Sequence, residues 1–234
     1  AVEHDTMDTT FRSMYLGLSA FLDANTERRE LLLGQRPPRF DSSFDEAIAQ
    51  AGDDFERVAL KAQAARDYFL LVGPPGTGKT SRALRRMVEH FYATSSMQIL
   101  LLAYTNRAVD EICQSLSSIT PGIDYIRVGS ELSCDVRFRG HLLENILAEC
   151  NSRREVNTRM TDCRVYVGTV ASIAAKAELF KLKRFDVAIV DEATQILEPQ
   201  LLGILCAKFA DERNAVGKFI LIGDHKQLPA VILQ

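Results

Sequence analysis

A glycine-rich stretch, GPPGTGKT at positions 73–80, has the residue types and spacing that bind phosphate groups. It matches the pattern G-x-x-x-x-G-K-[ST] and lies between a short apolar run and an amphipathic helical stretch, the context that this motif requires. The backbone N–H groups of such a loop turn inward around phosphates, and the following helix dipole adds to the attraction. Lys79 would reach the β- and γ-phosphates and Thr80 would bind Mg²⁺. The candidate nucleotide-binding residues are Gly73, Pro75, Gly76, Thr77, Gly78, Lys79, Thr80 and Ser81.

Two adjacent carboxylates follow a second apolar run, in FDVAIVDEATQ at positions 185–195. In P-loop enzymes the first acidic residue at such a strand end holds Mg²⁺, directly or through water, and Asp191 fits this role. Glu192 is then placed to orient and deprotonate the attacking water. The alternative is a helix N-terminus at which acidic side chains only favour the helix dipole. A phosphate-binding loop in the same chain favours the catalytic interpretation.

Three further polar stretches follow apolar runs: AYTNRAVDEI from Ala103, GTVASI from Gly168 and GDHKQLPAV from Gly223. Ligands of α/β proteins bind at the carboxyl ends of parallel strands, where all of these stretches are expected. Taken alone, Thr105, Asn106, Thr169 and Ser172 could simply cap helices. Gln227 could reach the γ-phosphate, where an amide donates to a phosphate oxygen or holds the attacking water. For Gln227 the alternative is a turn without a ligand.

Alternating strands and helices must position these residues. Continuous apolar strands are expected at Tyr68–Val72, Ile99–Tyr104, Tyr125–Val128, Val165–Val170, Val187–Val190 and Phe219–Ile222. Helical stripes, such as Ala108, Val109, Ile112 and Leu116, lie between several of them. This alternation predicts an α/β fold with a mainly parallel sheet that helices cover on both faces.

The pattern also divides the chain. Residues 8–33 and 44–66 have helical spacing, with Gly34 and Pro37-Pro38 between them, so residues 1–66 are expected to form an N-terminal helical accessory segment. Residues 67–234 would form the main domain. Within it, the polar and helical stretch at about 129–162 is interpreted as an insertion.

Composition places the chain among soluble globular proteins. It has 234 residues, 47% of them apolar and 25% charged, which is enough for a sizeable core. No apolar run approaches the ~20 residues of a membrane span, and the first residues lack the apolar core of a signal peptide. The five cysteines form no C-x-x-C pair, which argues against a disulfide framework or a zinc site and for a reduced, intracellular protein.

The charge balance is mildly acidic, with a net charge of −3, and it attracts no nucleic acid globally. Between Arg137 and Arg184, however, ten basic residues face five acidic ones. This excess is either a solvated helical surface or part of a path for a phosphate backbone.

Together these stretches resemble motifs I, Ia, Ic, II and III of the superfamily 1 helicases. The forms TN-x-AVD and DEATQ are similar to those of the branch that contains the nonsense-mediated-decay, senataxin-like and DNA-replication helicases. The resemblance runs in the right order from about Tyr68 to Val231. It is specific, because motifs Ia and III do not accompany generic P-loops.

The resemblance implies a RecA-like motor domain that uses ATP and Mg²⁺. Gly76 to Thr80 would bind ATP, Asp191 and Glu192 would hold Mg²⁺ and activate water, and Gln227 would contact the γ-phosphate. The residues implied to touch the backbone of single-stranded DNA or RNA are Thr105, Asn106 and Thr169. The implied partner in the ATP cleft is a second RecA-like domain of the same protein, with no membrane involved and with a cytoplasmic or nuclear location. The alternatives are a P-loop ATPase that remodels proteins and a scaffold that binds nucleotide without hydrolysing it.

The chain departs from the family pattern in two ways. Members usually carry a Gln that reads adenine about 18 residues before the first P-loop glycine, and here that place falls near Phe55, which is expected to pack in the core. Gln63 is too close to the loop to replace it. In addition, nothing follows motif III, so the chain is expected to be a first motor domain that is weak or inactive without the second domain and its arginine fingers.

Overall fold

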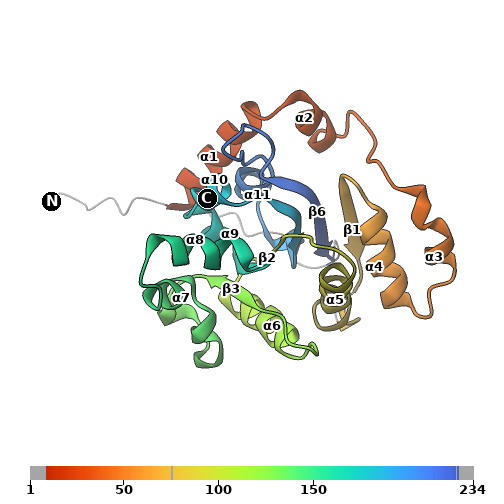
Figure 1. The fold of residues 1–234 in the computed structure, drawn as a ribbon. Helices are drawn as coiled ribbons and strands as arrows, with labels where there is room; N and C mark the ends of the chain where they lie inside the picture. The colour runs from red at the N-terminus through yellow and green to blue at the C-terminus, as the bar shows by residue number, and fades with distance from the viewer. Residues whose placement is uncertain (1–8, 75, 225, 227–234) are drawn as a thin grey trace.

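A parallel β-sheet of six strands forms the centre of the molecule (Figure 1). The computed structural model describes residues 9–74, 76–224 and 226. The strand order is β1-β6-β5-β2-β4-β3, and every neighbouring pair is parallel. The strands are β1 (Tyr68–Val72), β2 (Ile99–Ala103), β3 (Tyr125–Val128), β4 (Val165–Thr169), β5 (Phe185–Val190) and β6 (Val216–Gly223). All carboxyl ends therefore lie at one edge of the sheet, as the alternation of apolar runs and helices predicts.

One face of the sheet is covered by α4 (Asp54–Ala64), α5 (Arg85–Thr94) and α6 (Asn106–Ser117), with α5 between the other two (Figure 1). A π-helical turn, η2 (Lys79–Leu84), joins the phosphate-binding loop to α5. Apolar residues at helical spacing on α5 and α6 pack against alternate residues of the strands, and their side chains are buried. Burial of this kind supplies most of the stability of short helices.

The opposite face is covered by α7 (Leu143–Ala148), α9 (Val170–Ala174), α10 (Leu179–Leu182) and α11 (Glu198–Leu205). The stretch at about 129–162, expected as an insertion, contains two 3₁₀ turns, α7 and α8 (Arg153–Asp162), which together connect the neighbouring strands β3 and β4. Leu143 and Ile146 of α7 are buried in the core of this face, whereas α8 has no buried residue. The connection therefore contributes to the core mainly through α7, whereas α8 lies at the surface with only Met160 packed against that core.

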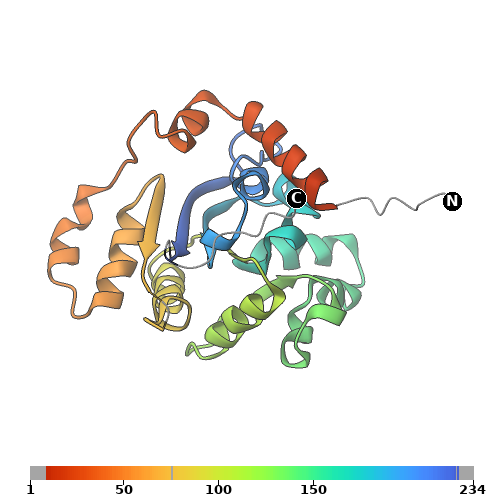
Figure 2. The ribbon, with the colours of Figure 1, turned by 180° about the vertical axis from the view of Figure 1, so that it is seen from behind.

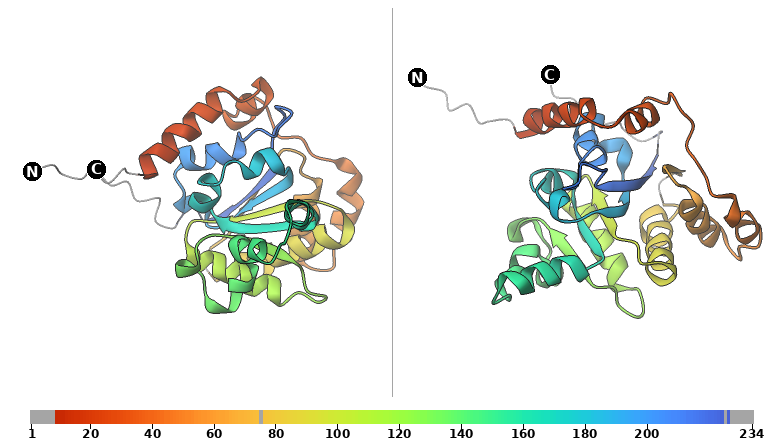
Figure 3. Two further views of the ribbon diagram at one scale, coloured as in Figure 1. Left: turned by 60° about the vertical axis from the view of Figure 1, so that its left-hand side comes forward. Right: turned by 45° about the horizontal axis from the view of Figure 1, so that its top comes forward.

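The N-terminal segment packs against this second face. The expected continuous helix is two helices, α1 (Thr9–Leu22) and α2 (Thr26–Leu32) (Figure 2). Helix α1 lies across α11, where a Cβ on Gly17 would stand 1.8 Å from the Pro199 carbonyl oxygen (Figure 3). Of the apolar residues of α1, Phe11, Tyr15, Leu18 and Leu22 are exposed, whereas Met14 and Phe21 are partly buried. The face of α1 that packs includes Gly17, where the two helix backbones come into close contact.

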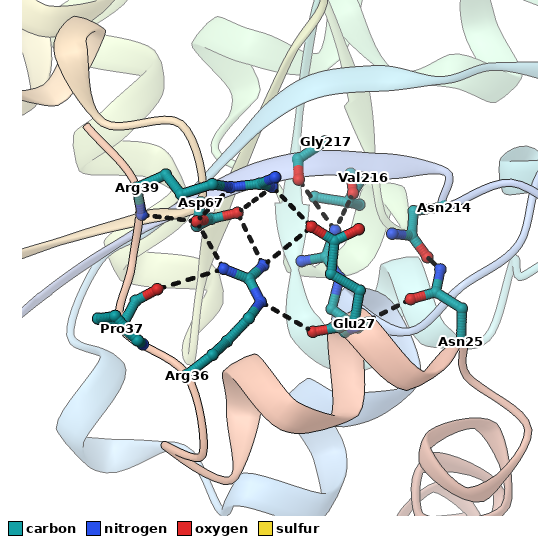
Figure 4. Close-up of polar contacts among 10 residues, drawn as sticks. Asn25, Glu27, Arg36, Pro37, Arg39, Asp67, Asn214, Val216 and Gly217 are labelled. Atoms are coloured by element: carbon teal, nitrogen blue, oxygen red, sulfur yellow. Dashed lines mark hydrogen bonds and ion pairs between the residues drawn. The ribbon is translucent and has the colours of Figure 1, made fainter. Parts of the chain in front are cut away.

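Polar contacts fasten this segment to the amino-terminal ends of β6 and β1 (Figure 4). Arg28 is 4% exposed, and its guanidinium donates to the carbonyl oxygens of Val216 and Gly217 at 2.7 and 2.9 Å. Asp67, just before β1, accepts hydrogen bonds from the guanidinium groups of Arg36 and Arg39. The segment then continues through η1 (Ser42–Phe44) and α3 (Asp45–Ala49) to α4. In this way residues 33–41 pass around the β1 edge from one face to the other (Figure 3).

The described part of the chain contains no helix that is both long and apolar enough to span a bilayer. The five cysteines are unpaired, and four of them are buried.

Candidate nucleotide-binding site

The glycine-rich loop follows β1 at the carboxyl edge of the sheet. The Gly73 N–H donates to the Gly223 carbonyl oxygen at 3.2 Å, which ties the start of the loop to the end of β6. Gly76 and Gly78 have φ angles of 76° and 81°, a region that residues with a Cβ rarely adopt. Their lack of a side chain is what allows the loop to turn back toward the helix. Pro75, a predicted binding residue, lies outside the described residues.

Side chains of the loop are drawn toward its own carbonyl groups. The Lys79 ammonium donates to the carbonyl oxygens of Gly73 and, at 3.3 Å, Pro74. Thr77 Oγ1 donates to the Pro74 carbonyl oxygen at 2.8 Å. The amine thus lies over the mouth of the loop, the position from which it can reach phosphate oxygens.

Asp191 comes directly after β5 and is brought to the loop by the order of the strands. Its carboxylate Oδ2 accepts a hydrogen bond from Thr80 Oγ1 at 2.5 Å, and its side chain is only 2% exposed. Burial raises the pKa of Asp191, an effect that the hydrogen bonds from Thr80 and the Glu192 N–H partly offset. A buried carboxylate beside a hydroxyl forms a pair of hard oxygen ligands, the type that Mg²⁺ prefers.

Glu192 has an unusual backbone. Its φ of 52° and ψ of 36° place a residue with a long side chain in the left-handed region, which costs free energy and is found mostly at functional sites. Burial raises its pKa first, and the negative charges of Asp191 and Glu111 raise it further. A carboxylate with a raised pKa at this position is suited to accept a proton from water.

These groups line one cleft with a volume of about 780 Å³. From the predicted set the cleft wall contains Gly76, Gly78, Lys79, Thr80, Ser81, Asp191 and Glu192. It also contains Gly223 and Asp224, which begin the predicted GDHKQLPAV stretch. Further wall residues, which sequence reasoning did not assign to the site, are Arg107, Asp110, Glu111, Gln114, Ser115, Asp135, Arg137 and Thr194. The cleft therefore extends from the phosphate-binding loop along α6 to the turn after β3.

The residues on α6 had a detectable signal. Arg107, Asp110, Glu111 and Gln114 are spaced by three, four and seven positions, so they share one helix face. Asp135 and Arg137 had none, because only the fold brings their turn to the cleft. Arg137 is held there by Asp135, with contacts of 2.9 and 3.1 Å, and by Gln114 Oε1 at 2.7 Å.

A buried ion pair braces this wall. Arg127 of β3 is 1% exposed and donates to Asp110 of α6, to the Ser133 carbonyl oxygen at 3.4 Å and weakly to the Cys113 sulfur. It joins α6 to the turn that carries Asp135. Breaking such a pair from one side leaves an uncompensated buried charge.

The predicted nucleic-acid residues lie at the same edge of the sheet, and two of them cap helices. Thr105 accepts the Ala108 N–H at 3.1 Å as the N-cap of α6. Thr169 accepts the Ser172 N–H at 3.0 Å as the N-cap of α9, is 5% exposed and also contacts the Ser172 hydroxyl at 2.7 Å. Asn106 is the half-buried first residue of α6. Contact of these three residues with a nucleic-acid strand stays a prediction. The Thr169 hydroxyl already contacts the backbone and side chain of Ser172.

Two other predictions concern residues around the loop. Asp224 follows β6 beside β5, as expected, and its carboxylate accepts the Lys226 N–H at 2.9 Å; Gln227 lies outside the described residues. Phe55 was expected in the core, and this is wrong. It is half-buried in the first turn of α4, and the guanidinium of Arg82 lies 4.2 Å from its ring centre.

The fold and the cleft define a P-loop nucleoside-triphosphatase domain. A family model described as "AAA domain" matches residues 52–163 and 149–234. The chain belongs to this family, and within it to the superfamily 1 helicase motor domains, as the motifs indicate.

Curated relatives agree with this assignment, and a solved structure agrees with the fold. The chain is 32% identical over 241 residues to "DNA replication ATP-dependent helicase/nuclease JHS1" of Arabidopsis thaliana, a match covering 97% of this chain and 17% of that protein. It is 32% identical over 249 residues to "DNA replication ATP-dependent helicase/nuclease DNA2" of Gallus gallus, covering 99% of this chain and 24% of that protein. The chain thus spans about a quarter or less of these relatives. The UvsW structure from bacteriophage T4 matches 78% of this chain and 34% of its own with a TM-score of 0.50 and 15% identity, which supports the fold alone.

Proposed function

We propose that the chain is the first motor domain of an ATP-dependent helicase or translocase that acts on single-stranded nucleic acid. The observation that carries the proposal is the contact between Thr80 and Asp191 in the same cleft as Lys79 and Glu192. It unites a phosphate-binding loop with an acidic strand end, the pair of features that P-loop enzymes use for phosphoryl transfer.

Mg²⁺ fits this donor set, since Thr80 and Asp191 offer a hydroxyl and a carboxylate oxygen within hydrogen-bonding distance of each other. When bound, the ion would neutralise charge on the phosphates. Lys79 would leave the loop carbonyls to neutralise the β- and γ-phosphates. Glu192 would orient the attacking water and accept its proton. In this proposal Gln227 contacts the γ-phosphate, and residues Thr105, Asn106 and Thr169 lie along the strand.

We favour DNA over RNA as the nucleic acid that is bound, because the names of the relatives refer to DNA replication. We also propose that a second RecA-like domain of the same protein completes the ATP cleft and that the protein acts inside the cell. The resemblance to the helicase family supports both points. The alternative is a P-loop ATPase that remodels proteins. It would use the same cleft, but it would leave the residues of motif Ia at the start of α6 without a nucleic-acid strand to contact.

Strand-stimulated ATP hydrolysis tests the proposal. The protein carrying this chain with its second motor domain is assayed with single-stranded DNA, RNA of the same sequence, or no strand. We expect DNA to stimulate hydrolysis. We also expect Lys79→Ala to lose turnover, because the variant lacks the positive charge that contacts the β- and γ-phosphates. Hydrolysis that no oligonucleotide stimulates would favour the protein-remodelling alternative, and wild-type turnover in Lys79→Ala would place the site elsewhere.

A further inference from the structure

An arginine lies on an aromatic ring beside the phosphate-binding loop. The guanidinium of Arg82 is 4.2 Å from the ring centre of Phe55, a distance typical of a cation–π contact. Arg82 is exposed and Phe55 is half-buried, so the aromatic ring backs the guanidinium from the protein side. The contact thus holds an exposed, planar cation beside the loop, where a ligand can reach it.

The local backbone places Arg82 next to the loop. The N–H groups of both Arg82 and Ala83 donate to the Gly78 carbonyl oxygen at 2.9 Å, which widens the first turn of the helix into a π-turn. Such turns occur often at functional sites. The Arg82 side chain lies against Gly78, since a Cβ added there would stand 3.1–3.4 Å from its Cβ, Cγ and Cδ atoms. The aliphatic part of the Arg82 side chain therefore packs beside Gly78, the last glycine of the phosphate-binding loop.

The arrangement of helices shows which end of a nucleotide would meet this pair. The turn η2 is in contact with α6 on one flank and with α4 on the other, and α5 continues between them (Figure 1). The cleft with Asp191, Glu192 and the wall of α6 lies on the first flank, where the proposed function places hydrolysis of the γ-phosphate. The sugar and the base of the nucleotide would then lie on the opposite flank, which is formed by Phe55 of α4 and Arg82.

Polar groups around Phe55 are already engaged. Asp53 accepts the Glu56 N–H at 2.8 Å, and the Glu56 carboxylate accepts the Gly52 N–H at 2.8 Å, so both side chains cap the start of α4. Gln63, farther along the same helix, contacts His90. Each of these three side chains thus already takes part in a contact within the fold.

We propose that Arg82, in contact with Phe55, provides the stacking surface for the base of the bound nucleotide, and that the site distinguishes poorly between adenine and guanine. The proposal rests on the proposed function, since it assumes phosphates in the glycine-rich loop. Stacking on a guanidinium plane tolerates any base, because every base has a π face, whereas selection requires hydrogen bonds to the base edge.

Binding of three probes to the 234-residue chain, measured by calorimetry with Mg²⁺, tests the proposal. The probes are ATP, GTP and inorganic tripolyphosphate, which has phosphates and no base. We expect the Kd values of ATP and GTP to agree within about threefold, and Arg82→Ala to weaken both by about tenfold while tripolyphosphate changes little. Arg82→Lys keeps the charge without the plane and should show the same loss. Phe55→Leu, which removes the support, should weaken nucleotide binding in the same sense.

Arg86→Ala is the matched control, because it removes an exposed arginine one turn farther along and leaves the Phe55–Arg82 pair intact. Equal weakening of tripolyphosphate and ATP in Arg82→Ala would make Arg82 a phosphate ligand and overturn the proposal. A preference for ATP over GTP above about tenfold would also overturn it. Lys79→Ala separates the two levels: ATP binding that survives this change refutes the nucleotide site itself, whereas Lys79-dependent binding that ignores Arg82 refutes only the stacking.

Discussion

Thr80 Oγ1 donates a hydrogen bond of 2.5 Å to Asp191 Oδ2, across 111 positions of sequence. The contact forms because β1 and β5 both lie next to β6, so their carboxyl ends meet at one edge of the sheet. Two oxygen ligands for a divalent cation are thereby brought together by the fold. The same contact explains how a carboxylate that is only 2% exposed is stabilised at this position.

Asp191→Asn should stabilise the chain and impair its nucleotide site. Because burial raises the pKa of Asp191, its ionised form costs stability at neutral pH, and a neutral amide removes that cost. We expect the Tm to rise by about 2–4 °C, which corresponds to about 1 kcal/mol in a domain of this size. The Mg²⁺-dependent part of ATP affinity should fall at least ~10-fold, since the amide is a poorer cation ligand.

Thermal unfolding and ATP titrations with Mg²⁺ or with EDTA measure both effects. Asp162→Asn, at an exposed position away from the cleft, serves as the control and should change neither quantity. An unchanged Mg²⁺ dependence in Asp191→Asn would remove Asp191 from the metal site.

Asp67→Asn should destabilise the fold by about 2–4 kcal/mol, because it leaves the Arg36 and Arg39 guanidinium groups facing a neutral group (Figure 4). Although burial opposes the effect, the hydrogen bonds from these two arginines lower the pKa of Asp67. A carboxylate with a lowered pKa contributes stability that is complete above its unfolded pKa of about 4 and is lost as the pH falls below it.

Urea unfolding at pH 7 and pH 3 checks this prediction. The difference in unfolding free energy between wild type and Asp67→Asn should be smaller at pH 3. Asp41→Asn, which breaks the more exposed ion pair with Arg66, should cost much less. A difference that is independent of pH would mean that the charge of Asp67 is not what anchors residues 36–39.

Gly17→Ala should loosen the N-terminal helix although alanine favours helices over glycine by about 1 kcal/mol. A Cβ at this position would overlap the Pro199 carbonyl oxygen, so α1 must move away from α11. We expect a net loss of about 1–3 kcal/mol and faster amide hydrogen exchange in α1. Gly140→Ala, where a Cβ would meet nothing within 4 Å, is the control. Unchanged protection of α1 in Gly17→Ala would show that the crossing does not hold the helix.

The basic residues between Arg137 and Arg184 should divide into two groups. Arg153 and Arg154 are exposed on α8 without an ion pair among the described residues, whereas Arg159 pairs with Asp124 at 3.0 Å. If α8 lies on the path of the strand, Arg153→Ala with Arg154→Ala weakens binding to all DNA sequences. The slope of log K against log salt should then fall by about one unit for each lost phosphate contact.

Arg164 belongs to the structural group. Its guanidinium donates to the carbonyl oxygens of Tyr92 at 3.1 Å and Ser95 at 2.6 Å, and it lies 4.2 Å from the Tyr92 ring centre. Arg164→Ala should lower the Tm and leave the salt slope of the folded protein unchanged. Oligonucleotide titrations over a range of salt concentrations compare the variants, and an unchanged slope in the double variant would make α8 a solvated surface only.

Several features of this protein were determined by the sequence alone. The strands at Tyr68–Val72 and Tyr125–Val128 have the predicted bounds, because short, mostly apolar runs between helical stretches are typical of strands. Burial on both faces was not needed for this, since Leu70 and Val72 of β1 are exposed. The loop at positions 73–80 and the Asp191-Glu192 pair were also evident, since their chemistry requires particular residue types at a short spacing. Local patterns of this kind need no knowledge of distant contacts.

Tertiary structure alone decided how distant residues meet. The hydrophobic pattern of α1 did not show which residues pack, because the helix contacts Pro199 through Gly17 and leaves Phe11 and Tyr15 exposed. Asp135 and Arg137 carried no signal, since only the course of the chain after β3 brings them to the cleft. Phe55 is an aromatic residue and was predicted to lie in the core. Its contact with Arg82 depends instead on the widened π-helical turn that carries Arg82. Each of these outcomes depends on backbone geometry between segments far apart in sequence, and a linear pattern of residue types does not encode that geometry.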